Sequence, residues 1–278
     1  MNTTNEMNLG VGDTLVTIAP HRGAIVTSFR VGDRELLYLD QATFNDPSKN
    51  VRGGIPILFP SPGKLENDTW TRAGRSGQLK QHGFARNVAW RVMDQGSSHA
   101  TLAFDATPET LQSFPWRFEA RLTYTLAPNS LRIDFQLENT DDSALPFAFG
   151  LHPYFLAKDK AKARVPTLAT HAFNNVTKRI EPFTGFDFTQ DEVDLHLIDH
   201  GSTRARLETG DGTAVIIDAS DEFVRWIVWT VRGKDYICVE PWTAPGNALN
   251  SGDDVLQLVP GEMRTLWTQI SLEASHEP

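Results

Sequence analysis

Residues 117–137 read RFEARLTYTLAPNSLRIDFQL, with apolar and polar side chains alternating on both sides of a short turn. Successive side chains of a β-strand point to opposite faces, so this period of two predicts a strand with one buried face. The turn residues 127–130 read APNS, and the same alternation resumes after them. The two runs therefore predict an antiparallel hairpin.

The same strand signal recurs along the chain, whereas helical periodicity is nearly absent. Two further hairpins are predicted, one joining 15–18 to 24–29 and one joining 204–209 to 214–218. Strand-like runs also lie at 88–92, 223–229 and 266–272. A helix is predicted to start at Thr107-Pro108-Glu109, where a threonine cap precedes a proline at the first helical position. Many strands joined by short turns predict an all-β fold, a large antiparallel β-sandwich, and we expect residues 1–278 to form a single domain.

The segment 56–81 differs from the rest because prolines and glycines interrupt any regular pattern in it. Irregular segments of this length are uncommon in folded domains and are usually functional or disordered. The segment leads directly into His82, which carries one of the candidate side chains. We therefore predict a functional lid or rim there.

Composition restricts the class of protein. The formal net charge of −9 offers no basic surface for a phosphate backbone, so nucleic acid is not an expected partner. A single cysteine, Cys238, excludes an internal disulfide, and no window holds the roughly 18 consecutive apolar residues of a membrane helix. The first residues lack the basic and apolar regions of a secretion signal, so we expect a cytoplasmic protein with no membrane partner.

Two histidines and one glutamate stand out as candidates for proton transfer near neutral pH. His152 lies in the nearly continuous apolar run 147–155, where an imidazole needs a specific partner. Glu240 shares a strand face with Cys238, and Pro241 is expected to end that strand. A carboxylate beside His152 would keep its imidazole protonated near neutral pH. His82 could equally be a structural histidine, and an ion pair with an arginine is the less favoured alternative for Glu240.

Two arginines are candidates for binding a ligand. Arg52 precedes a pair of glycines. Arg86 follows His82 by four residues, and in an extended segment this even offset would place Arg86 and His82 on one face. Both arginines could equally be surface residues. No local spacing for a metal site occurs, and no serine-hydrolase or nucleotide-binding motif is present. The six other histidines are predicted to be surface residues; they are His21, His99, His171, His196, His200 and His276.

Four segments carry a family resemblance: RGGIPILFP at 52–60, QHGFAR at 81–86, HPYF at 152–155 and VEPW at 239–242. In sequence and order they resemble the aldose 1-epimerase (galactose mutarotase-like) superfamily, over residues from about 10 to 272. The resemblance implies a β-sandwich called a supersandwich, with a sugar held on its concave sheet. It also implies interconversion of α and β anomers through the open-chain aldehyde, without metal or organic cofactor.

The resemblance assigns roles to individual residues. It implies that Glu240 is the base for the anomeric hydroxyl, His152 the acid for the ring oxygen, and His82 a second histidine near that oxygen. Arg52 matches a substrate-binding arginine. Asp194 is our choice for an aspartate that binds sugar hydroxyls, and Asp187 is the alternative.

The substrate and assembly stay open at this point. The segments with Arg52 and Arg86 are similar to the hexose-6-phosphate branch of the superfamily, whereas HPYF at 152–155 is closer to enzymes of free aldoses. We favour an aldose 1-epimerase of broad sugar specificity acting on an aldohexose, with a glucose-6-phosphate 1-epimerase as the alternative. The expected partner is a small sugar or sugar phosphate, and the protein is expected to be a monomer or homodimer. A non-catalytic carbohydrate-binding protein and a glycoside hydrolase using Asp194 with Glu240 are the competing functions.

Overall fold

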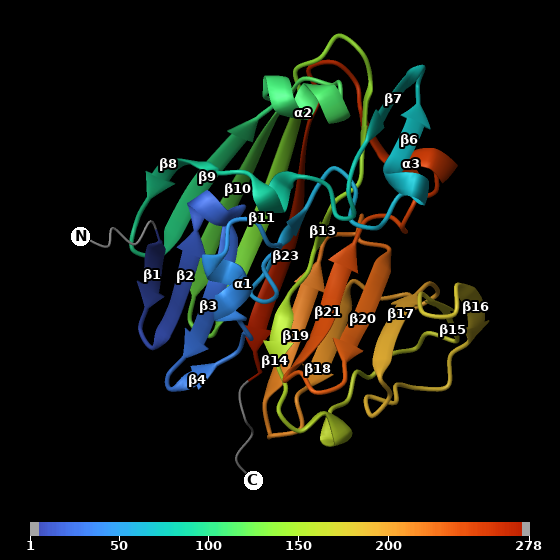
Figure 1. Cartoon of the computed structure of the whole chain (residues 1–278). Helices are drawn as coiled ribbons and strands as arrows, with labels where there is room; N and C mark the ends of the chain where they lie inside the picture. Colours follow the sequence, from blue (N-terminus) through green and yellow to red (C-terminus); the bar gives the residue numbers. More distant parts are fainter. Residues whose placement is uncertain (1–5, 274–278) are drawn as a thin grey trace.

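Two antiparallel sheets dominate the computed structural model, which describes residues 6–273 (Figure 1). The first sheet has, in spatial order, β18 (Arg204–Glu208), β19 (Ala214–Ala219), β23 (Met263–Leu272), β11 (Ser130–Asn139), β10 (Phe118–Ala127), β9 (His99–Asp105) and β8 (Arg91–Gln95). The second has β16 (Arg179–Pro182), β15 (His171–Asn174), β17 (Glu192–Leu197), β20 (Arg225–Val231), β21 (Tyr236–Trp242), β13 (Gly150–Leu151) and β5 (Ile57–Leu58), with β14 (Tyr154–Leu156) also paired to β21.

Smaller elements surround these sheets. A four-stranded sheet comprises β1 (Met7–Val11), β2 (Thr14–Ala19), β3 (Ile25–Val31) and β4 (Arg34–Glu35); two-stranded pairs join β6 (Thr69–Arg72) to β7 (Arg75–Gln78) and β12 (Leu145–Phe147) to β22 (Leu256–Leu258). The helices are short: α1 (Gln41–Asn45), α2 (Pro108–Ser113), α3 (Ala248–Ser251) and the 3-10 turns η1 (Pro20–Arg22), η2 (Glu66–Asp68), η3 (Ala85–Asn87) and η4 (Lys160–Lys162). Within residues 6–273, no helix has the length and apolar character needed to span a membrane.

The hairpin predicted from residues 117–137 is confirmed as β10–β11. Leu122 pairs with Phe135 and Leu126 with Leu131, so the apolar side chains of both strands lie on the same face. That face is buried, and the polar residues between them are partly exposed. The prediction of an all-β, antiparallel β-sandwich is confirmed.

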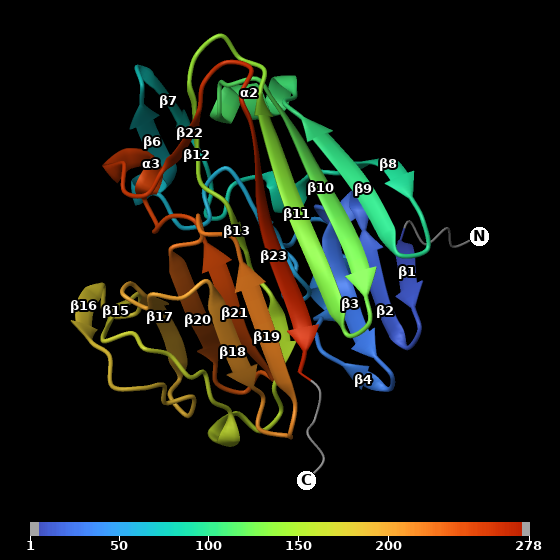
Figure 2. The same cartoon turned by 180° about the vertical axis from the view of Figure 1, so that it is seen from behind.

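The main core lies between the two large sheets (Figure 2). Leu122 and Phe135 enter it from the first sheet, and Val228, Ile237 and Val239 enter it from the second. Each of these side chains is at most 2% exposed. Alternate side chains of β20 and β21 are buried in this core, so the intervening side chains of each strand point to the opposite face of the sheet.

The other predicted elements agree in part. The hairpins β2–β3 and β18–β19 are confirmed, and α2 begins after Thr107 with reciprocal hydrogen bonds between Thr107 and Thr110. The run at 88–92 becomes strand only from Arg91, because the backbone at Val88 and Trp90 bonds to the turn at 20–23 instead. The run at 223–229 begins as strand at Arg225, since the chain turns at Phe223.

The segment 56–81 is more regular than predicted. It contains the hairpin β6–β7, whose turn residues Ala73 and Gly74 both have positive φ, at 50° and 74°. Two central residues with positive φ suit the tight right-handed twist of a two-residue hairpin. Position 77 in β7 has to be a glycine, because a Cβ there would lie 2.9 Å from the ring of Trp70. These glycines therefore shape a hairpin rather than an irregular loop.

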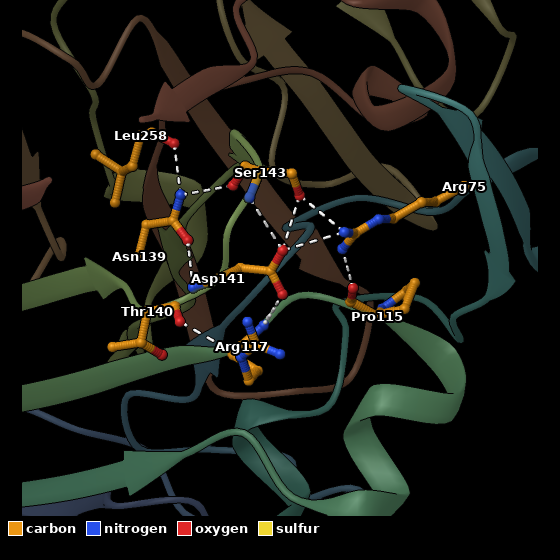
Figure 3. A network of polar contacts seen from close by, with 8 residues as sticks. All are labelled: Arg75, Pro115, Arg117, Asn139, Thr140, Asp141, Ser143 and Leu258. Carbon is orange, nitrogen blue, oxygen red and sulfur yellow. Dashed lines mark hydrogen bonds and ion pairs between the residues drawn. The ribbon is translucent and has the colours of Figure 1, made fainter. Parts of the chain in front are cut away.

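A buried polar network holds this hairpin to the rest of the fold (Figure 3). Arg75 Nη2 lies 3.1 Å from Asp141 Oδ1 and 2.8 Å from Ser143 Oγ, and Arg75 also donates to the Pro115 carbonyl. The backbone N–H of Arg117 donates to the second oxygen of Asp141 at 3.0 Å. Burial alone would raise the pKa of Asp141, but these hydrogen bonds outweigh burial and lower it. The network anchors the segment that leads to His82.

Candidate active site

The candidate site lies on the face of β21 that points away from the main core. Cys238 and Glu240 lie on that face, and Ile237 and Val239 lie in the core, as the sequence predicted. The prediction that Glu240 ends the strand is wrong. Pro241 occupies a strand position opposite Trp226, and the ladder continues to Trp242, because a proline removes only one backbone donor.

Glu240 is held by an indole and lies beside an imidazole. Its side chain is 1% exposed, and its Oε2 accepts a hydrogen bond of 3.0 Å from Nε1 of Trp242. Its Oε1 lies 3.4 Å from Nε2 of His152. The fold thus brings together a histidine and a carboxylate that are 88 positions apart in the chain. The alternative that Glu240 pairs with an arginine is not seen among residues 6–273.

His152 reaches Glu240 from the connection between β13 and β14, both of which pair with β21. Its ring stacks on Tyr154, with centroids 4.6 Å apart, and its backbone N–H donates to Pro56. Nδ1 of His152 has no hydrogen-bond partner in the described part of the chain. These contacts fix the orientation of the ring and leave Nδ1 without a hydrogen-bond partner among the described residues.

His82 enters the cluster from a tight turn. His82 and Gly83 have φ of 73° and 68°, and a Cβ on Gly83 would lie 2.1 Å from the carbonyl of Phe59, so glycine is required there. The His82 ring lies 5.5 Å from the ring of His152, centroid to centroid. Its Nδ1 is bonded to the carbonyl of Pro62, which lies in the segment 56–81. That segment therefore borders the site.

Burial controls the protonation of these groups. Desolvation, reinforced by the charge of Arg86, lowers the pKa of His82 to about 3. Desolvation also lowers the pKa of His152 well below its usual value, with His82 and Arg86 acting in the same direction. Burial raises the pKa of Glu240, and the charge of Asp194 adds to the effect. The expectation that Glu240 keeps His152 protonated is therefore wrong for the free site, because desolvation of both groups outweighs their attraction.

Both candidate arginines lie at this site, but the backbone at Arg86 differs from the predicted extended conformation. Arg86 is part of the 3-10 turn η3 and not of an extended segment, since the turn at His82 ends any strand. The Arg52 guanidinium lies over the ring of Trp229, with Cζ 5.8 Å from its centroid. Burial lowers the pKa of Arg86 to about 10. Neither guanidinium has a carboxylate within 4.0 Å among residues 6–273.

Asp194 lies on β17, two strands from β21. Its Oδ1 is 3.2 Å from Nε2 of His196, and its Oδ2 accepts a hydrogen bond of 2.7 Å from Asn175. The charge of Asp194 raises the pKa of both His82 and Glu240. Asp187 lines the same cavity of about 320 Å³ as Asp194, but its carboxylate bonds to the neighbouring Thr189. The structure thus places Asp194, rather than Asp187, in the electrostatic field of the cluster.

The prediction that the remaining histidines are surface residues is wrong for two of them. His196 is 5% exposed, and its ring packs against Trp242 at 5.3 Å. The signal was present in EVDLHL at 192–197, where Asp194 and His196 alternate with apolar residues. His200 is 8% exposed and bonds to the carbonyl of Val224. His276 lies outside the described residues.

Together these residues can move a proton on and off a neutral ligand. The buried pair of His152 and Glu240 can accept one proton and deliver one, and His82 adds a neutral imidazole. Arg52, Arg86 and Asp194 add groups that can bind hydroxyl or anionic groups.

Comparison with known proteins identifies the family of this chain. The crystal structure of the Slr1438 protein from Synechocystis sp. PCC 6803 superimposes with a TM-score of 0.93 and is 34% identical, covering 96% of this chain and 95% of that one. A galactose mutarotase-like protein from Lactobacillus casei has a TM-score of 0.82 and 23% identity, covering 96% of this chain and 100% of that one. A protein from Cenchrus ciliaris, provisionally named glucose-6-phosphate 1-epimerase, is 29% identical over 79% of this chain and 72% of its own length. The family model described as aldose 1-epimerase matches residues 8–271, and the chain belongs to this family.

Proposed function

We propose that this protein is an isomerase that interconverts the α and β anomers of an aldohexose. The observation that carries the proposal is the buried contact of 3.4 Å between His152 Nε2 and Glu240 Oε1. Opening a sugar ring requires one group to take a proton from the anomeric hydroxyl and another to give a proton to the ring oxygen. A histidine and a carboxylate in contact meet both requirements within one complex.

The proposed cycle balances its protons. Glu240, as carboxylate, takes the proton from the anomeric hydroxyl while His152, as imidazolium, gives one to the ring oxygen. The bond between C1 and the ring oxygen breaks, and the aldehyde rotates about the C1–C2 bond. The same two groups then exchange roles to close the ring on the other face. The catalytic pair returns to its starting protonation state.

The protonation of the free site supports this cycle. Burial raises the pKa of Glu240 and lowers that of His152, and both shifts favour the neutral pair, in which the carboxyl holds the proton, before sugar binds. Moving this proton to His152 gives the carboxylate and imidazolium that the cycle uses. Hydrogen bonds from sugar hydroxyls to Glu240 favour that transfer, because they stabilise the charged form of the carboxyl.

The remaining residues are proposed to hold the sugar. With a pKa of about 3, His82 is neutral near pH 7, and its bond to the Pro62 carbonyl places the ring proton on Nδ1. Its Nε2 is then an acceptor for a sugar hydroxyl near the ring oxygen. Asp194 accepts hydrogen bonds from further hydroxyls, and Arg52 donates hydrogen bonds at the opposite end of the sugar.

A phosphorylated hexose is the second candidate substrate. Arg86 is half-buried and Arg52 is exposed, and neither guanidinium has a carboxylate partner within residues 6–273. A phosphate bound at the site would accept charge-assisted hydrogen bonds from both guanidinium groups. The relative from Cenchrus ciliaris carries a name that refers to such a substrate.

Anomer exchange measured by NMR tests the function and the substrate together. The protein is added to freshly dissolved α-D-glucose, α-D-galactose and glucose 6-phosphate in separate tubes. Faster exchange of the free sugars supports a broad aldose 1-epimerase, and exchange confined to the phosphorylated sugar supports the second candidate. Absence of acceleration with all three sugars would refute the proposed activity and favour a carbohydrate-binding protein.

A further inference from the structure

Cys238 lies beside the proposed catalytic pair and has no part in the proton transfer. Its side chain is fully buried on the same face of β21 as Glu240. One ligand atom each from His152, Cys238 and Glu240 lie within 4.8 Å of one another. A nitrogen, a sulfur and an oxygen donor thus lie close together in one part of the site.

This donor set matches the chemistry of zinc. Zn²⁺ binds imidazole nitrogen and carboxylate oxygen at about 2.0–2.2 Å and thiolate sulfur at about 2.3 Å, in tetrahedral geometry. Two ligands at these distances on a tetrahedral centre are about 3.4 Å apart. The separation between His152 Nε2 and Glu240 Oε1 is 3.4 Å. A cation placed between them needs little movement of either side chain.

The surroundings already orient the three donors. Trp242 holds the second oxygen of Glu240 at 3.0 Å, and Tyr154 stacks on the ring of His152 at 4.6 Å. Contacts of this kind fix the direction of metal ligands. A thiol distinguishes this cluster from a site for Mg²⁺ or Ca²⁺, which prefer oxygen ligands only. The side chain of His152 is 9% exposed, so water from solvent can complete the coordination.

We propose that His152, Cys238 and Glu240 form a binding site for Zn²⁺, and that bound zinc excludes the sugar and stops anomer exchange. Binding releases two protons to solvent, that of the Cys238 thiol and the one that the neutral pair holds on the Glu240 carboxyl, and the metal takes up the imidazole nitrogen and carboxylate oxygen that the reaction needs. The inhibitory effect rests on the proposed function, whereas the binding of the metal does not.

Metal binding is tested first, without reference to activity. Co²⁺ serves as a coloured substitute for Zn²⁺ and is titrated into chelator-treated full-length protein. We expect one bound ion per chain, with an absorption band from charge transfer between thiolate and cobalt that added Zn²⁺ removes. Cys238→Ser and Cys238→Ala should both lose the band. A parent protein that gives no such band would overturn the proposal.

Inhibition is tested next, by anomer exchange with increasing Zn²⁺. We expect EDTA to restore the parent rate and higher sugar concentrations to weaken inhibition. Loss of a metal's supporting contact typically weakens affinity about 10–100-fold, so loss of the Cys238 ligand should weaken inhibition by at least that factor. The basal rate of the Cys238 variants should stay close to the parent rate.

A surface histidine provides the matched control. His99 lies 2.9 Å from Asp94 in an exposed pair, which could also attract zinc. His99→Ala should leave inhibition unchanged. If Cys238→Ser and the parent were inhibited equally, the site assignment would be wrong. A protein that binds cobalt through thiolate but shows no anomer exchange would keep the metal site and refute only the proposed function.

Discussion

The indole Nε1 of Trp242 donates a hydrogen bond of 3.0 Å to Oε2 of Glu240, a buried carboxyl two positions earlier on the same strand face. This is the hydrogen bond that favours the charged form of Glu240, against burial and the charge of Asp194. Trp242 therefore acts through Glu240 as a positioning residue, and its hydrogen bond stabilises the ionised carboxylate that acts as the base.

Trp242→Phe removes that donor and keeps most of the ring. We expect the pKa of Glu240 to rise further and kcat/KM for anomer exchange to fall about 10-fold, as for the loss of a hydrogen bond to a charged group. The pH profile of the variant should shift toward higher pH. Trp226→Phe is the matched control, because the indole of Trp226 bonds to Ser202 outside the site. Equal rates for the two variants would contradict the role of Trp242.

Asp194 and Asp187 can be separated by one pair of variants. Asp194→Asn should raise KM for the sugar about 10–100-fold, since a charged acceptor of sugar hydroxyls is lost. Asp187→Asn should have no effect, because that carboxylate bonds to Thr189 beside it. Steady-state kinetics of both variants checks the assignment. The reverse result would transfer the role to Asp187.

The low pKa of His82 has a consequence for stability. Below about pH 6.5 the unfolded chain protonates this imidazole, whereas the folded chain keeps it neutral down to about pH 3. The unfolded state then binds more protons, so His82 makes the free energy of unfolding decrease as pH falls through this window. Glu240, with a raised pKa, contributes the opposite slope above its unfolded pKa.

Comparison with His82→Gln isolates the contribution of His82. Between pH 6 and pH 5 the parent should lose up to about 1.4 kcal/mol of unfolding free energy relative to the variant. Urea denaturation at the two pH values measures this difference. A constant difference between parent and variant would mean that folding does not lower the pKa of His82.

Arg86 should discriminate between neutral and phosphorylated sugars. Arg86→Met keeps the length of the side chain and removes its charge, so a phosphate ligand would lose a charge-assisted partner. We expect KM for glucose 6-phosphate to rise about 10–100-fold and KM for glucose to change little. Arg91→Met is a control, since Arg91 pairs with Asp105 on the first sheet. A similar rise in KM for both sugars would mean that Arg86 supports the structure of the site and does not bind the phosphate.

Much of this account was predictable from local sequence patterns. The alternation in 117–137 predicted the β10–β11 hairpin, and the parity of 236–240 placed Cys238 and Glu240 on one face. These predictions succeed because side-chain alternation is a property of the strand itself. The family segments placed His82 and His152 near each other, which spacing alone could not do.

Other features depended on tertiary structure and were missed. Arg86 lies on a 3-10 turn because His82 and Gly83 both adopt positive φ, a conformation that the sequence did not reveal. The sequence predicts His196 at the surface because its contact with Trp242 joins two separate strands, which no local pattern reveals. The protonation of His152 and Glu240 depends on how deeply the fold buries both, so a carboxylate beside a histidine was not enough to predict it.

The central claim is that Glu240 takes the proton from the anomeric hydroxyl. Glu240→Gln keeps the size of the side chain and an acceptor for the Trp242 indole, but removes the base. NMR anomer exchange with whichever of the three test sugars the parent accelerates, together with binding of that sugar by calorimetry, measures the effect. We predict a rate about 10²–10⁴-fold below that of the parent with sugar binding retained. A variant that exchanges anomers as fast as the parent would contradict the account.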